Sequence, residues 1–127
     1  MKAARWIIPI LFVLLGLYAV GCGGDDNKNP VNPGGGTPDV TIQIVGNLGA
    51  NSYSPDTATV TVGQTVAWHN ADGAAHTATA DNGVTFGTGT ISPGATSATT
   101  AMNSQGTFPY HCTIHGVTMA GTLVVVP

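Results

Sequence analysis

Charge is scarce in this sequence, and positive charge is almost absent from most of it. Only 7% of the 127 residues are charged, and the formal net charge is −3. Beyond the first five residues the single cation is Lys28, whereas all six acidic residues are Asp and begin at Asp25. Nucleic-acid binding depends on Lys and Arg side chains that contact phosphates, so this class of function is excluded. Any protein partner is expected to present a basic face.

The start of the chain has no acidic residue and carries the two other cations. Lys2 and Arg5 precede an apolar run over residues 6–21, the order of an export signal, and this run is short for a bilayer span of about 20 apolar residues. Its end, Ala19-Val20-Gly21-Cys22, resembles the lipobox of bacterial lipoproteins, in which the Cys sulfur takes a diacylglyceryl group. We expect a lipoprotein signal peptide over residues 1–21 and lipidation at Cys22, with an uncleaved anchor or ordinary secretion as alternatives. Each places the rest of the chain outside the cytoplasm, and lipidation would hold it on a membrane, in the periplasm or at the cell surface.

Residues 22–38 have almost no hydrophobic side chains. Such a segment cannot bury enough apolar surface to offset the entropy of ordering, so we expect a flexible tether. The remaining residues, 39–127, suffice for one domain. With Cys22 acylated, Cys112 would be a lone thiol in an oxidising compartment, and metal ligation would protect it. A Cys22–Cys112 disulfide is the alternative, although it would tie a structureless tether to the domain.

Helical periodicity is absent from residues 39–127, and aromatic residues are only 6% of the chain. Short runs rich in Val and Thr, separated by turn residues, are typical of a β-sandwich or barrel instead. Alternation along these runs places Trp68 and Cys112 on inward faces, with His69 and His111 on the opposite faces. The predicted strands cover residues 40–45, 58–62, 65–70, 76–80, 97–102, 106–112 and 121–126.

The segment from Tyr110 to Met119 gathers a thiol, an imidazole and a thioether at the end of one predicted strand. Cys112 and His115 are three positions apart, so a turn can bring both donors to one point. A second imidazole must come from elsewhere, and His76 begins another predicted strand after a short loop. A thiolate, two imidazoles and a weak thioether are the donors of a trigonal copper site with a long axial bond. The sequence therefore predicts one copper ion.

Several stretches together resemble the plastocyanin/amicyanin branch of the cupredoxins, and the resemblance covers essentially all of residues 39–127. They are residues 66–70, His76, residues 110–115 and residues 119–121. The resemblance implies an all-β Greek-key β-sandwich of about seven to eight strands, with a type 1 copper at one end that shuttles between Cu(II) and Cu(I). Carried over by position, the equatorial ligands are His76, Cys112 and His115, and the axial ligand is Met119. The loop between His115 and Met119 has three residues, one fewer than plastocyanin-like loops and one more than amicyanin-like loops.

Three polar residues are expected to support the ligands through hydrogen bonds. Thr77 follows the first His, where many relatives have Asn, and can keep the backbone N–H contact to the thiolate while offering its hydroxyl toward Thr113. Asn70 ends the strand before the His76 loop. Such outer-shell bonds fix ligand orientation, so Asn70, Thr77 and Thr113 are the predicted outer shell.

The resemblance implies a monomeric one-electron carrier for a redox partner, either a cytochrome or a copper oxidoreductase. The expected contact is a small apolar patch around His115 that comprises Gly73, Ala74, Ala75, Gly116 and Val117. A copper storage or delivery protein is the alternative, but the chain has only three Met, one of them the initiator. We expect no enzyme activity, because four His are too few for a further copper cluster.

Overall fold

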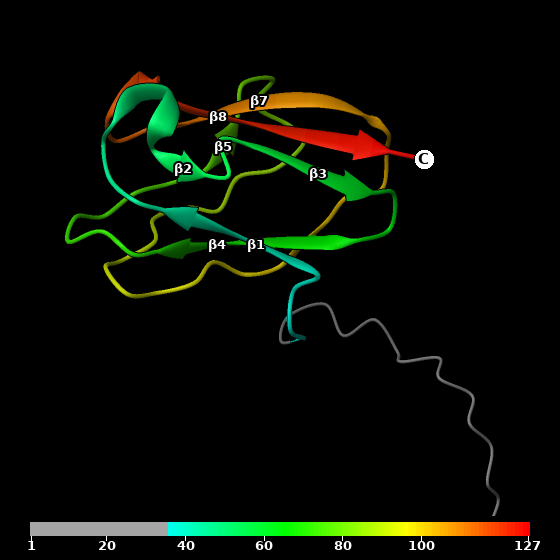
Figure 1. Ribbon diagram of the computed structural model, residues 1–127, viewed down its shortest axis with the longest axis horizontal. Coiled ribbons are helices and arrows are strands. Elements are labelled where there is room, and N and C mark those ends of the chain that lie inside the picture. Colours follow the sequence, from blue (N-terminus) through cyan, green and yellow to red (C-terminus); the bar gives the residue numbers. More distant parts are fainter. Residues whose placement is uncertain (1–35) are drawn as a thin grey trace, which may run out of the picture.

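A computed structural model describes residues 36–127 as two packed four-stranded sheets (Figure 1). In Figure 1, β1 and β4 lie in one layer, and β3, β7 and β8 lie in the other. The strand order of the first sheet is β2 (Tyr53–Ser54), β1 (Val40–Ile44), β4 (Thr65–Asn70) and β6 (Thr100–Ala101). The order of the second sheet is β3 (Thr57–Thr61), β8 (Gly116–Val126), β7 (Gly106–Cys112) and β5 (Thr79–Ala80). The prediction of an all-β sandwich of seven to eight strands is confirmed.

Helical structure within residues 36–127 is limited to one 3-10 turn, η1 (Gly49–Asn51). No helix in this part of the chain is long and apolar enough to cross a membrane. The predicted signal peptide, the lipidation site Cys22 and most of the tether lie outside the described residues, so these assignments stay predictions.

Aromatic side chains fill the space between the sheets. Trp68 of β4 and Tyr110 of β7 have no exposed surface, and their rings meet edge to face with centroids 5.7 Å apart. Tyr53 contacts Tyr110 in the same way at 4.7 Å, and Phe86 stacks on Trp68 at 5.1 Å. The prediction that Trp68 belongs to the core is confirmed. Alternation of side chains along the strands therefore builds the core, because it turns one large aromatic ring of each sheet inward.

Strand β5 is shorter than the predicted strand 76–80, because the backbone amides at its start have other partners. His76 forms an isolated bridge with Ile91, Thr77 N–H donates to the Cys112 sulfur, and Ala78 N–H donates to the Thr88 hydroxyl. Regular pairing with β7 begins only at Thr79. The interruption is what turns the backbone of Thr77 toward the thiol.

Three larger differences separate the other predicted strands from the structure. The predicted strand 97–102 is reduced to β6, because only Thr100 and Ala101 of this range pair with β4. β8 begins at Gly116 rather than residue 121, because its N-terminal part pairs with β7 up to Cys112 through a register shift. The two-residue strand β2 was not predicted; it pairs Tyr53 with Ile44 and is too short to show an alternating pattern.

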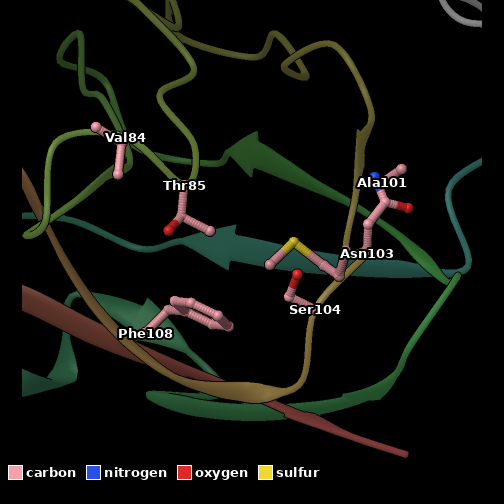
Figure 2. Close-up of a pocket in the computed structure, with 7 residues that line it drawn as sticks. Val84, Thr85, Ala101, Asn103, Ser104 and Phe108 are labelled. Atoms are coloured by element: carbon pink, nitrogen blue, oxygen red, sulfur yellow. The ribbon is translucent and has the colours of Figure 1, made fainter.

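A cavity of about 320 Å³ lies apart from all the predicted ligands. Its lining comes from the loop before Phe86, from β6 and the residues after it, and from β7: Val84, Thr85, Ala101, Met102, Asn103, Ser104 and Phe108. Figure 2 shows Thr85, Ser104 and Phe108 around this space. The lining has no His, Cys, Asp or Glu side chain, so the cavity offers no strong metal donor.

Candidate metal centre

Cys112 is the last residue of β7, and its side chain is completely buried. A register shift between His111 and Cys112 ends the regular ladder, and Gly116 takes a φ of 84°, a left-handed conformation that favours glycine. The chain therefore reverses within four residues. The reversal brings the Nδ1 atom of His115 to 3.5 Å from the Cys112 sulfur.

His76 reaches the same point from the loop that follows β4. Its ring is completely buried, and its Nδ1 atom lies 3.9 Å from the Cys112 sulfur. The rings of His76 and His115 are 4.7 Å apart between centroids. One ligand atom from each of His76, Cys112 and His115 lies within 4.8 Å of the others, which is close enough for a single metal ion to bind all three.

Thr77 binds the thiol and the ligand loop at the same time. Its backbone N–H donates to the Cys112 sulfur at 3.3 Å, and its hydroxyl oxygen accepts the Thr113 N–H at 2.8 Å. The two hydroxyls of Thr77 and Thr113 are also 3.1 Å apart. The contacts expected of Thr77 are therefore present, and they connect the His76 loop to the turn that carries Cys112.

Asn70 acts on the loop rather than on a ligand. Its amide donates to the carbonyls of Ala74 at 2.7 Å and Ile91 at 2.9 Å, and its Oδ1 accepts the Asp72 N–H at 3.0 Å. These bonds fix the loop that delivers His76. Asn70 therefore supports the ligands indirectly, because it holds the backbone of the His76 loop and of the neighbouring segment at Ile91.

Asp72 is the residue that the sequence reasoning missed. Its Oδ2 lies 2.7 Å from the Nε2 atom of the His76 ring, and its side chain is 32% exposed. The sequence pattern that points to this contact is the spacing, since Asp72 lies four residues before His76 in a loop that must turn back on itself.

Met119 is fully buried in β8, directly before Ala120, which pairs with His111. It is thus on an inward face next to the register shift that precedes Cys112. The geometric cluster consists of the His and Cys donors, and the axial role of Met119 stays a prediction.

The other two histidines have partners of their own. His69 Nδ1 lies 2.9 Å from the Thr96 hydroxyl, and His111 Nδ1 lies 2.6 Å from Asp81 Oδ1. Neither belongs to the cluster of possible metal donors in residues 36–127. Strand alternation had separated both from the predicted ligands.

Hydrogen bonds favour the thiolate form of Cys112. Burial by itself would raise the thiol pKa, but hydrogen bonds from the Thr77 N–H and from His115 lower the pKa of Cys112 from 9.0 to about 6. A metal can then bind sulfur at neutral pH with little competition from protons. The buried sulfur and two imidazole nitrogens are the donors that copper prefers in a trigonal site.

This pKa predicts a pH dependence for the metal-free protein. The pKa of Cys112 is lower in the folded than in the unfolded state, so the thiolate stabilises the folded protein fully above pH 9. This stabilisation declines as the pH falls from about 9 to about 6, and it is lost below pH 6. Ultraviolet absorbance should show a thiolate titration with a midpoint near pH 6. The difference in free energy of unfolding between wild type and Cys112→Ser should grow with pH over the same interval. A thiolate midpoint near pH 9 would contradict the proposed role of the hydrogen bonds.

The Thr77 hydroxyl gives a second prediction. In Thr77→Val the side-chain shape is kept, but Thr113 N–H loses its acceptor, so the free energy of unfolding should fall by about 1 kcal/mol. Denaturant unfolding of the metal-free protein measures this change. Thr113→Val is the matched control, since it preserves the bond from its own backbone N–H and removes only the contact between the hydroxyls. Equal losses in the two variants would show that the Thr77 acceptor has no special role.

Comparisons with known proteins agree with this geometry. The family described as Cupredoxin-like domain matches residues 26–125. A purple cupredoxin from Nitrosopumilus maritimus is 27% identical, with a TM-score of 0.61, over 69% of this chain and 100% of that protein. A reduced Cu(I) form of an amicyanin variant is 25% identical, with a TM-score of 0.59, over 72% of this chain and 86% of the other. A comparison with curated protein sequences finds no match.

A copper-containing nitrite reductase from Thermus scotoductus is also similar. It is 26% identical with a TM-score of 0.60, and the match covers 73% of this chain but only 23% of the enzyme. The likeness is therefore to one part of a much longer protein. The fold and the buried His–Cys–His cluster together support one copper ion as the cofactor. The chain belongs to the cupredoxin family.

Proposed function

We propose that this protein is a type 1 copper protein that carries single electrons outside the cytoplasm. The observation that carries the proposal is the buried Cys112 thiol with the Nδ1 atoms of His76 and His115 at 3.9 and 3.5 Å. Bound copper would supply the redox change between Cu(II) and Cu(I). The protein would supply the thiolate and the imidazoles in a preset arrangement. Met119 is the proposed axial donor.

The surroundings of the cluster support rapid electron exchange. Thr77 and Asn70 hold the ligand loop by hydrogen bonds, and the core packs beneath Cys112. A rigid donor set limits how far atoms move when the oxidation state changes. Amicyanin variants of the same fold occur both as an oxidised form and as a reduced Cu(I) form, which agrees with a carrier.

The two imidazoles differ in their access to solvent, and this difference suggests the electron route. His76 is fully buried, whereas His115 is half-buried between two exposed apolar residues, Ile114 at 50% and Val117 at 74% exposure. Gly73 and Ala74 of the other ligand loop are also exposed. An apolar surface around a ligand edge fits a brief contact with a redox partner such as a cytochrome or copper oxidoreductase. We propose that electrons pass through the His115 edge of a monomer.

The place of action is proposed from the sequence alone. The export signal and the lipobox-like Cys22 would hold the domain by lipid at an extracytoplasmic membrane face, in the periplasm or at the cell surface. Sixteen residues between Cys22 and Asp39 would give the tether a root-mean-square length of roughly 20–24 Å.

The test is to add Cu(II) to the purified metal-free protein and follow visible absorption, paramagnetic resonance and a redox titration. An intense thiolate-to-copper band that bleaches and returns over repeated reduction is the expected result. His76→Ala should lose the band, while His69→Ala, a histidine outside the cluster, should keep it. A colourless complex would refute the copper–thiolate site. Ready release of Cu(I) to a chelator after each reduction would favour storage or delivery over electron transfer.

A further inference from the structure

The two nitrogens of the His76 ring have separate partners. Nδ1 is 3.9 Å from the Cys112 sulfur, and Nε2 is 2.7 Å from Asp72 Oδ2. The ring itself has no exposed surface, so water cannot compete for either nitrogen. A carboxylate on Nε2 keeps the proton there and leaves Nδ1 free to bind a metal.

The loop holds the Asp72 carboxylate in this position. Its second oxygen, Oδ1, accepts the Gly73 N–H at 2.7 Å, and its backbone N–H donates to Asn70 Oδ1 at 3.0 Å. Asn70 is in turn bonded to the Ala74 and Ile91 carbonyls. The carboxylate is therefore fixed at both oxygens and at its backbone.

No Lys or Arg side chain of the domain offsets this charge. Residues 39–127 contain no Lys or Arg, so the sequence itself rules out an ion pair between Asp72 and either residue type within the domain. The charge is also only partly open to water, since the side chain is 32% exposed. It therefore acts on the neighbouring ring at short range and with incomplete screening.

We propose that Asp72 is a positioning residue that orients His76 toward the metal and lowers the reduction potential of the bound copper. The inference rests on the proposed copper site. A negative charge hydrogen-bonded to a ligand raises the basicity of that ligand and stabilises Cu(II) more than Cu(I), because Cu(II) carries the larger positive charge. An uncharged acceptor at the same place would preserve the orientation but not the electrostatic effect.

Asp72→Asn separates these two effects. With its amide oxygen turned to Nε2, the Asn side chain still accepts the ring proton and gives up only the bond from the Gly73 N–H, so the copper–thiolate band should persist while the potential rises. We expect the ratio of Cu(I) to Cu(II) affinity to increase at least tenfold, which corresponds to 59 mV for a one-electron couple. Asp56→Asn is the matched control for net charge, because the Asp56 carboxylate binds the Thr57 N–H and no imidazole.

A second measurement uses the metal-free protein. Nitrogen NMR should show His76 with its proton on Nε2 in the wild type and a loss of this preference in Asp72→Ala, which has no acceptor. An unchanged potential in Asp72→Asn, or a shift no larger than that of Asp56→Asn, overturns the inference although the band still forms. An unchanged tautomer in Asp72→Ala overturns the positioning role. If wild-type protein forms no thiolate band at all, it is the proposed copper function that fails, and this inference fails with it.

Discussion

Cys112→Ser is expected to abolish the visible copper band and to weaken copper binding by more than about 100-fold. Loss of an outer-shell hydrogen-bond partner typically weakens metal affinity by about 10- to 100-fold, and loss of a direct ligand should exceed this. The serine hydroxyl is nearly the same size but is not ionised at neutral pH, whereas the pKa of Cys112 is lowered to about 6. The substitution therefore removes the one soft anionic donor and leaves two imidazoles. Absorption spectroscopy and competition with a chelator of known affinity measure the two effects.

A control in the same strand separates ligand loss from structural damage. His111→Ala alters the residue next to Cys112, but His111 binds Asp81 and is not part of the donor cluster. This variant should retain the band and most of the copper affinity. If Cys112→Ser kept the band, or if His111→Ala lost it while remaining folded, the assignment of the thiolate would be wrong.

Two of the three clustered donors could be predicted because their chemistry is local in the sequence. Cys112 and His115 are close enough for one turn to bring them together, and strand alternation removes His69 and His111 from consideration. His76 was a candidate from its place at the start of a predicted strand, and the family resemblance assigned it as a ligand, since 35 residues separate it from Cys112 and nothing in its own loop specifies where that loop points.

Asp72 could not be assigned in the same way, because an isolated Asp in a loop is usually solvated. Its contact with Nε2 depends on the bonds that Asn70 makes to Ala74 and Ile91, and Ile91 is 21 residues from Asn70. Strand ends were missed for a related reason. The amides of Thr77 and Ala78 bond to a sulfur and a hydroxyl from distant segments, so the predicted strand 76–80 is broken by tertiary contacts rather than by its own residues.

Gly121→Ala is expected to destabilise the protein by about 3 kcal/mol, near the upper end of the usual cost of overpacking. Gly121 lies opposite Tyr110 in the β7–β8 pair, and a Cβ atom on it would lie 2.5 Å from Cζ and 2.6 Å from the hydroxyl oxygen of Tyr110. The Tyr110 ring cannot easily move away, because it is fully buried and contacts the rings of Tyr53, Trp68 and Phe86. Denaturant unfolding should show the loss, and the melting temperature should fall by roughly 12–24 °C.

Two further variants identify the ring as the cause. Gly73→Ala is the matched control, because Gly73 has no positive φ and a Cβ there would have no neighbour within 4 Å. In a Tyr110→Leu background the Gly121→Ala change should cost much less, since the six-membered ring is gone. An equal cost in both backgrounds would mean that the strain lies in the backbone of β8 rather than at Tyr110.

The same substitution should also weaken the copper site, because Tyr110 connects the core to the ligands. Tyr110 is two residues before Cys112, and it packs on Tyr53, whose hydroxyl donates to the Thr77 carbonyl at 2.6 Å. A displaced Tyr110 would thus disturb both the strand that carries the thiol and the residue whose N–H binds it. We expect Gly121→Ala to bind copper more weakly than wild type even at temperatures where it is fully folded, and unchanged affinity there would show that the site is insulated from the core.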